Sequence, residues 1–323
     1  MAPSFTSETL RQVDADSWII GGRLLLSHRP TPLPGDASWS DGNGHFFSIS
    51  EASDHDLDLS SVQPLPQPNI PFPLVNEVVG FAHPRAAWEI GNAFLKVITP
   101  VSPQITREHV TLDTIHKMKH EMQLDFALPT VIYHGEWDDR YYLILTKVPG
   151  QTLHKMWPLI DEKARQHYVS RVARLCELLS TRQGSSISGV DGGYLPEYYL
   201  TQKEKEVSNF SPTRLLQNSR ASGMDCSTTF VFYHCDLGAG NILIDTTDGS
   251  LAIIDWECAG FVPREWIRTK FRVCAGMDLE MSPSNDDIPR HDWRARMQRE
   301  LEKDGFPDVA ETWMEWFRCR DRE

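Results

Sequence analysis

The sequence HCDLGAGNILIDTTDGSLAIID, from residue 234 to residue 255, decides the fold. It contains two short apolar runs, Ile242–Ile244 and Leu251–Ile254, separated by a segment with an Asp-Gly pair. Asp-Gly between apolar runs is a strong signal for a β-hairpin. Because a hairpin brings its two open ends together, Asn241 before the first strand and Asp255 after the second are predicted to be neighbours.

A second carboxylate, Asp236, precedes Asn241 by five residues. An amide oxygen and a carboxylate oxygen are hard ligands that suit Mg²⁺, and a further carboxylate can serve as a base. The stretch therefore predicts a site for Mg²⁺-dependent phosphate chemistry.

The pattern His-x-Asp-x-x-x-x-Asn, followed after the hairpin by Ile-Asp-Trp-Glu, resembles the catalytic core of the aminoglycoside phosphotransferase family, in particular its fungal-type branch. The resemblance covers about residues 75–275. It implies an α+β, bilobal protein-kinase-like fold, with a small antiparallel-sheet N-lobe and a mainly helical C-lobe. It also implies an enzyme that transfers a phosphoryl group from ATP, with Mg²⁺, to a hydroxyl group of a small molecule. In that chemistry Asp236 is the catalytic base, and Asn241 and Asp255 hold the metal.

Three regions follow from this assignment. Residues 74–147 are expected to form the N-lobe with the nucleotide-binding sheet and helix. Residues 148–323 are expected to form the C-lobe with the catalytic loop, the metal site and the substrate pocket. Residues 1–73, which the resemblance does not reach, are expected to be an N-terminal extension and linker, with strands at Trp18–Leu26 and His45–Ile49.

Apolar runs and turn residues predict the strands of the N-lobe. They are Leu74–Val79, Ala86–Ile90, Ala93–Ile98, Leu128–His134 and Tyr141–Thr146.

Lys96 is the single charge in one of these strands, and a buried lysine without a partner is costly. The resemblance implies that Lys96 contacts the phosphates of ATP and pairs with a glutamate of the next helix, predicted over Thr106–Met122. Glu108 is assigned as that partner, with Glu121 as the alternative. An edge-strand lysine that faces water is the other reading of Lys96.

The resemblance also places the remaining contacts to ATP. Thr146 and Val148 match the hinge, where backbone groups bond the adenine. The loop Gly80–Arg85 stands where protein kinases carry a glycine-rich loop, but it contains one glycine. No G-x-x-x-x-G-K-[ST] motif occurs, so a P-loop fold is excluded.

The C-lobe is predicted to be mostly helical. A long helix is expected over Asp161–Gln183, capped by Asp161 and ended by Gly184. His234 is expected to bond the backbone near Asp255 rather than to act as a base. Acidic residues in 278–287 form either a rim for an ammonium group or a solvated loop. Further helices are predicted near Pro212–Gln217 and at Glu265–Ala275, His291–Lys303 and Val309–Arg320.

Composition narrows the class of partner. The formal net charge of −13 argues against a nucleic-acid binder, which needs a basic face. Six cysteines without CxxC spacing indicate free thiols in a reducing compartment. Neither a secretory signal nor an apolar run long enough to span a bilayer is recognised, so the expected location is the cytoplasm, with ATP and a small hydroxyl compound as partners.

The chain after Asp255 separates small-molecule kinases from protein kinases. Protein kinases carry a long activation segment that ends in Ala-Pro-Glu, and this chain has neither feature. A small acceptor is therefore predicted, and a choline- or homoserine-kinase-type activity would use the same residues. A catalytically silent nucleotide-binding regulator is the alternative from another class.

Overall fold

The computed structural model describes residues 9–32, 37–53, 75–80, 84–201, 203–204, 207–227, 229–279 and 288–319. The chain divides into two compact units. The first contains Met1–Pro100 and Pro129–Lys147, and the second contains Val101–Leu128 and Val148–Glu323.

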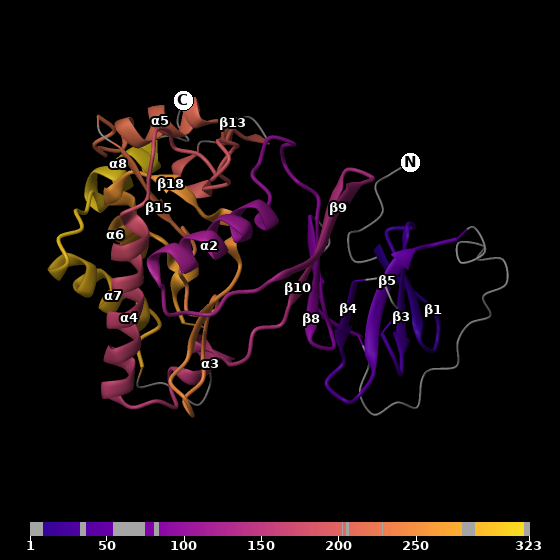
Figure 1. Ribbon diagram of the computed structural model, residues 1–323. Coiled ribbons are helices and arrows are strands. Elements are labelled where there is room, and N and C mark those ends of the chain that lie inside the picture. The colour runs from indigo at the N-terminus through magenta and orange to yellow at the C-terminus, as the bar shows by residue number, and fades with distance from the viewer. Residues whose placement is uncertain are drawn as a thin grey trace. The chain divides into compact units, whose positions relative to one another are not determined.

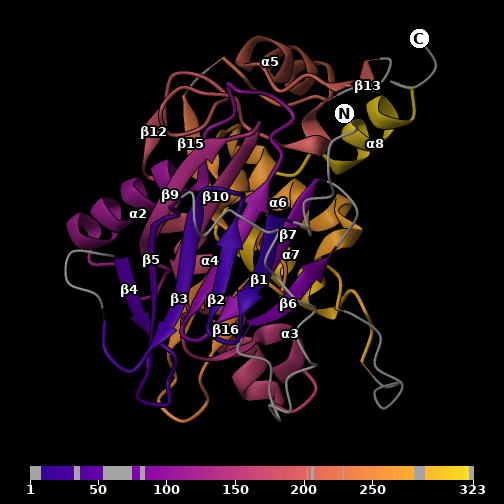
Figure 2. The same ribbon diagram turned by 90° about the vertical axis from the view of Figure 1, so that its right-hand side faces the viewer.

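The first unit begins with a five-stranded antiparallel sheet in the order β1-β2-β3-β5-β4 (Figures 1 and 2). Figure 2 looks onto the face of this sheet. Its strands are β1 (Leu10–Asp14), β2 (Ser17–Ile20), β3 (Leu24–Arg29), β4 (Ala37–Ser40) and β5 (Phe46–Glu51). The segment from Leu10 to Glu51 thus supplies a whole sheet to the first unit.

The single strand predicted over Trp18–Leu26 is wrong. The chain turns back within it, and β2 pairs antiparallel with β3 so that Ile20 lies opposite Leu24. Gly21 and Gly22 make the turn with φ angles of 57° and 64°. Glycine adopts this left-handed region without the steric cost that a side chain would bring.

The second sheet of the first unit is also five-stranded and antiparallel, in the order β6-β7-β8-β10-β9. All five strands predicted for the N-lobe are present in it, although the one predicted to begin at Leu128 begins at Val131. The strands are β6 (Val75–Gly80), β7 (Arg85–Ile90), β8 (Ala93–Ile98), β9 (Val131–Trp137) and β10 (Arg140–Thr146).

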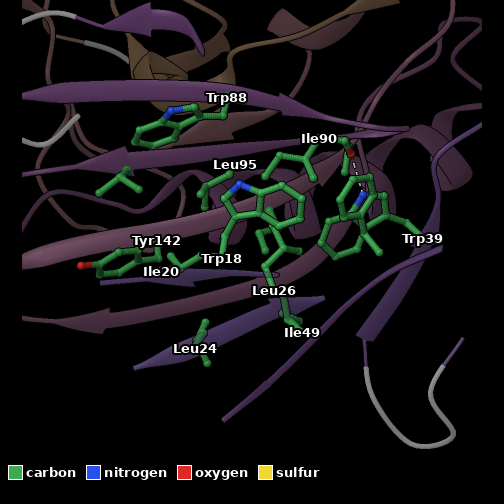
Figure 3. Close-up of a cluster of buried hydrophobic side chains, with 14 of the residues drawn as sticks. Trp18, Ile20, Leu24, Leu26, Trp39, Ile49, Trp88, Ile90, Leu95 and Tyr142 are labelled. Atoms are coloured by element: carbon green, nitrogen blue, oxygen red, sulfur yellow. Dashed lines mark hydrogen bonds between the residues drawn. The ribbon is translucent and has the colours of Figure 1, made fainter. Parts of the chain in front are cut away.

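The two sheets share one hydrophobic core (Figure 3). In β7 and β8 every second residue is buried, because successive side chains of a strand point to opposite faces. Burying each large apolar side chain contributes about 1.5–3 kcal/mol. Trp39 adds a directional link, since its indole Nε1–H donates to the carbonyl oxygen of Ile90 over 2.7 Å.

Lys96 lies on the other face of β8 from this core. Its neighbours in sequence, Leu95 and Val97, are fully buried in the core. Strand alternation therefore directs the Lys96 side chain away from the first sheet.

The second unit is mainly helical, and helices α4, α6 and α7 lie side by side in it (Figure 1). The helices are α2 (Glu108–Met122), α3 (Leu153–Met156), α4 (Glu162–Ser180), α5 (Pro212–Ala221), α6 (Arg264–Val273), α7 (Asp292–Lys303) and α8 (Ala310–Cys319). Short 3₁₀ turns lie at Tyr198–Leu200, Trp256–Cys258 and Ala275–Met277.

Three small sheets complete this unit. One contains β11 (Gln151–Thr152), β16 (Ile242–Ile244) and β17 (Leu251–Ile253). The others contain β12 (Gln183–Gly184), β15 (Phe230–Tyr233) and β18 (Gly260–Val262), and β13 (Lys203–Glu204) with β14 (Val207–Ser208). The predicted α+β class is confirmed.

Helix α4 begins as predicted and ends earlier than predicted. The side chain of Asp161 accepts a hydrogen bond from the N–H of Ala164 over 2.7 Å, which is an N-cap. The helix ends at Ser180, and Gly184 pairs in a strand instead of terminating the helix. A Cβ atom at Gly184 would lie 2.5 Å from the ring of Phe261, so this glycine permits close packing.

The lobe division 1–73, 74–147 and 148–323 stays a prediction. In the division by contacts, helix α2 belongs to the second unit and residues 10–51 contribute to the first. None of the helices in the described part of the chain combines the length and the apolar character needed to cross a bilayer.

Candidate active site

The predicted hairpin is confirmed. Strand β16 pairs antiparallel with β17, with Ile242 opposite Ile253. One step beyond this pair, the N–H of Ile254 donates to the carbonyl oxygen of Asn241 over 3.0 Å. Asn241 is therefore paired with the residue that directly precedes Asp255.

Asn241 connects the hairpin to Asp236. Its side-chain Nδ2–H₂ group donates to the backbone oxygen of Asp236 over 2.9 Å and to the carboxylate Oδ2 of the same residue over 3.0 Å. The backbone N–H of Asn241 donates to the carbonyl of Gly238, which closes the loop between the two residues. Because a carboxamide is planar, the Oδ1 of Asn241 points away from Asp236.

His234 fixes the backbone on both sides of the site. Its side chain is fully buried. Nε2 lies 3.0 Å from the carbonyl oxygen of Ile254, and Nδ1 accepts the N–H of Asp236 over 3.2 Å. A carbonyl oxygen only accepts, so Nε2 carries the proton and the ring is neutral. The predicted structural role of His234 is confirmed.

Two residues of the site have a left-handed backbone. Cys235, directly before Asp236, and Asp255 both have φ of 63°. Such conformations cost about 1–3 kcal/mol for residues other than glycine, and they concentrate at functional sites. The two glycines of the loop, Gly238 and Gly240, do not have positive φ angles.

Burial raises the pKa of the Asp236 carboxyl above its usual range, and the negative charges of Asp255 and Glu197 raise it further. The charge of Lys270 and the hydrogen bond from Asn241 act in the opposite direction and do not cancel the rise. A carboxylate whose pKa is raised accepts a proton more readily near neutral pH. Its environment therefore suits a general base.

Three carboxylates converge next to Asp236's loop. Glu108, Asp255 and Glu257 each offer one oxygen, and the three oxygens lie within 4.8 Å of one another. Glu108 is almost fully buried, and its Oε1 accepts the N–H of Trp256 over 3.1 Å. Carboxylate oxygens at this spacing suit a hard divalent cation such as Mg²⁺.

The comparison with known families identifies the chain. Its residues 85–266, more than half of the 323, match the model of the phosphotransferase enzyme family. The chain belongs to this family. Membership confirms the predicted assignment to small-molecule kinases that phosphorylate hydroxyl groups, with the protein-kinase-like fold.

Solved structures of aminoglycoside phosphotransferases are similar at low sequence identity. APH(2'')-Ib in its ADP-bound form is 12% identical, with 78% of this chain and 86% of that chain covered at a TM-score of 0.48. APH(3'')-Id of Streptomyces rimosus is 15% identical, with 72% and 88% covered at a TM-score of 0.42. No curated protein matches the sequence.

In this phosphotransferase the predicted hinge lies where the chain passes between its units. Thr146 belongs to the first unit and Val148 to the second. The N–H of Thr146 donates to the carbonyl of Thr130 over 2.9 Å, and the N–H of Lys147 donates to the carbonyl of Asn92 over 2.8 Å. Thr146 would therefore offer a nucleotide its carbonyl oxygen and not its N–H.

The predicted pair of Lys96 and Glu108 stays a prediction, because the two residues belong to different units. Within the second unit, Glu108 lies beside Asp255 and Glu257, a proximity that the sequence did not reveal. Glu108 and Trp256 are 148 residues apart, and no local pattern reports such a contact.

The phosphotransferase also contains a buried ion pair that sequence reasoning missed. The Nζ of Lys270 lies 2.6 and 2.7 Å from the two carboxylate oxygens of Glu197. Trp266 Nε1–H and the N–H of Tyr199 donate to the same carboxylate. Burial alone would lower the pKa of Lys270, but the charge of Glu197 raises it above the usual value.

Parts of two further predictions lie outside the described residues. They concern 81–83 of the loop Gly80–Arg85 and 280–287 of the acidic segment. In the described part of that segment, Asp278 forms an ion pair with Arg294. Its charge is thereby partly neutralised.

Proposed function

We propose that this phosphotransferase transfers the γ-phosphate of ATP, with Mg²⁺, to a hydroxyl group of a small molecule. The observation that carries the proposal is the hydrogen bond from the amide of Asn241 to the carboxylate of Asp236. It holds the proposed base and a proposed metal ligand in one rigid group at the open end of the hairpin. Free cysteines at all six positions support a reducing compartment, for which we propose the cytoplasm.

Asp236 would orient the acceptor hydroxyl and take its proton. One oxygen of its carboxylate accepts a hydrogen bond from Asn241, and the other oxygen would accept the proton of the hydroxyl. The raised pKa brings the carboxylate closer to the proton affinity that general-base catalysis needs.

Asn241 and Asp255 would hold Mg²⁺ with their side-chain oxygens. The residues fit this ion, because the donors are oxygens only and Asn241 turns its nitrogen toward Asp236. Glu257 adds a further oxygen close to Asp255. Bound Mg²⁺ supplies neutralisation of the phosphate charge during transfer.

The first unit would hold the nucleotide. Lys96 would contact the phosphates with a side chain that β8 directs away from the apolar core. Glu108 would pair with Lys96, as the family pattern implies. The carbonyl of Thr146 and the backbone of Val148 would bond the adenine.

A screen of ATP consumption against a panel of small hydroxyl compounds, with Mg²⁺, tests the proposal. The active acceptor is then used with two variants. Asp255→Ala should lose both turnover and the thermal shift caused by Mg-ATP. Asp236→Asn should lose turnover and keep the thermal shift. Asp248→Asn, in the exposed hairpin turn, is the matched control and should behave as the unmodified protein.

Two outcomes contradict the proposal. Turnover that survives in Asp236→Asn would show that another group takes the proton. Binding of Mg-ATP without consumption in the presence of any acceptor would favour the silent regulator.

A further inference from the structure

The first sheet carries a cluster of two histidines and an aspartate, side chains of types that can ligate a metal, and the proposed phosphotransfer does not use them. His28 is the penultimate residue of β3, Asp41 directly follows β4, and His45 directly precedes β5. Figure 1 labels these three strands. Each side chain offers one ligand atom, and the three atoms lie within 4.8 Å of one another. Strands β3, β5 and β4 are adjacent in the sheet, so pairing of the strands fixes this meeting point.

Asp41 is held in one orientation. Its Oδ1 accepts the N–H groups of Asn43 and His45 over 2.7 and 3.0 Å. Its Oδ2 is thereby turned toward Nε2 of His28, at 3.0 Å. Burial raises the pKa of this carboxyl, but the hydrogen bonds from Asn43, His28 and His45 outweigh burial and lower the pKa. Asp41 is therefore ionised at neutral pH.

His28 is fixed from three sides. Its side chain is 11% exposed, and its ring packs on Phe47 with 4.8 Å between ring centroids. Nε2 faces Asp41, whereas Nδ1 lies 3.5 Å from Oδ1 of Asp16. A histidine that binds a metal with one nitrogen usually offers the other N–H to a carboxylate. Asp16 stands in that outer position.

We propose that His28, Asp41 and His45 bind a divalent transition-metal ion, with Zn²⁺ as the best match. Two imidazole nitrogens and one carboxylate oxygen are ligands that Zn²⁺ accepts. Ligand atoms about 2.0–2.2 Å from Zn²⁺ in tetrahedral geometry lie about 3.3 Å from each other. The 3.0 Å between His28 and Asp41 is close to that separation.

His45 completes the site by a small movement. It is exposed, and its ring stacks on that of His28 with 5.2 Å between the centroids. Since its side chain faces solvent, it can approach the ion without disturbing the core. Water would occupy the fourth position. The ion would then tie β3 to the loop between β4 and β5.

Metal titration of the full chain, stripped with a chelator, tests the site. Isothermal titration with Zn²⁺ should give one tight site at pH 7.5, and Co²⁺ should give the visible absorption of a tetrahedral complex. Because metal ligands must be deprotonated to bind, affinity should fall as the pH is lowered.

Single variants identify the ligands. Asp16→Asn should weaken binding about 10–100-fold, as is typical of outer-sphere partners. His45→Ala and Asp41→Asn should weaken it by more than about 100-fold, since direct ligands exceed that range. The largely buried His28 packs in the sheet, so His28→Ala can fail to fold. His45 is exposed, so His45→Ala tests whether the cluster binds the metal without that complication.

The control uses a second histidine pair. His116 and His120 lie four residues apart on α2, at a spacing that can also hold a metal. The double variant His116→Ala/His120→Ala should bind Zn²⁺ as tightly as the unmodified chain. The proposal is overturned if Zn²⁺ binding is lost in the His116→Ala/His120→Ala variant or retained in His45→Ala. It is also overturned if the unmodified chain has no tight Zn²⁺ site.

Discussion

The two units bury different kinds of side chain. In the described part of the first unit the buried polar residues are Thr9, Ser27 and Ser48, which are uncharged. The carboxylate of Asp41, at the proposed zinc site, is also largely buried, with 6% of its side chain exposed. The described residues of the second unit include several buried groups that carry or can carry charge. They are Glu108, Glu197, His234 and Lys270.

The difference indicates that the first unit contributes mainly apolar packing, whereas the second unit contains the charged groups of the proposed site. Burying a charge is costly unless it is paired and hydrogen-bonded, whereas burying an apolar side chain is favourable. The sandwich of the first unit is therefore a stable platform. In the proposed function, carboxylates in a partly dry site would serve phosphotransfer, which would account for part of the cost that the second unit bears.

The largest expected effect separates activity from stability at Asp236. Asp236→Asn should lower kcat about 10²–10⁴-fold, the usual contribution of a general base. At pH 7.5 its free energy of unfolding should be unchanged or higher. Folding raises the pKa of Asp236, so ionisation above the unfolded pKa of about 3.9 destabilises the fold. Asparagine removes that penalty and can still accept from Asn241.

Urea unfolding of Asp236→Asn and the unmodified chain at pH 7.5 and pH 4 measures this. The stability gain should shrink at pH 4, where the aspartate itself becomes neutral in part. A large loss of stability at pH 7.5 would mean that the Asp236 carboxylate stabilises the second unit.

The next effect concerns the buried pair of the second unit. Lys270→Met should lower the free energy of unfolding by about 3–5 kcal/mol, because it leaves the Glu197 carboxylate buried without its cation. The double variant Lys270→Met/Glu197→Gln should recover most of this loss, since it removes both charges. Urea unfolding measures both.

An exposed ion pair provides the control. Lys303 pairs with Glu300 three residues earlier, and its side chain is 68% exposed. Lys303→Met should cost no more than about 1 kcal/mol. Equal losses in Lys270→Met and Lys303→Met would remove the contrast between buried and exposed charge.

The sequence predicted local structure well where a short pattern determines it. The hairpin of β16 and β17 follows from apolar runs around an Asp-Gly turn, and His234 was placed correctly because the motif fixes its neighbours. The start of α4 follows from the capping residue Asp161. In each case the interacting residues are close in sequence.

The errors share a different cause. Gly184 was predicted to terminate the helix. Instead, its missing side chain lets the ring of Phe261 pack closely, and Phe261 is distant in sequence. The ion pair of Glu197 and Lys270 spans 73 residues and has no periodic signal. Tertiary contacts of this kind determine the environment of Asp236, so its raised pKa could not be predicted from the motif.

A smaller effect is expected in the first unit, at a buried directional bond of its core. Trp39→Phe should lower the free energy of unfolding by about 1–3 kcal/mol, because the buried carbonyl of Ile90 loses its donor. Ile49→Val in the same core is the control. It removes one methylene group and no side-chain hydrogen bond, and should cost about 0.5–1.5 kcal/mol. A smaller loss in Trp39→Phe than in Ile49→Val would show that apolar packing alone holds the sandwich.

The smallest effect is expected at an exposed residue of the second unit, and it tests whether burial decides the cost of losing a charge there. Asp161 is exposed, and its carboxylate accepts the N–H of Ala164 at the start of α4. Asp161→Ala should lower the free energy of unfolding by about 1 kcal/mol, and Asp161→Asn should restore most of it, because the amide oxygen can accept the same bond. Turnover should be unchanged in both, since the cap contacts no residue of the proposed site. If Asp161→Ala destabilised the protein as much as Lys270→Met, the loss of an exposed charge would cost as much free energy as the loss of a buried one. The contrast between the second unit and the apolar first unit would then need another explanation.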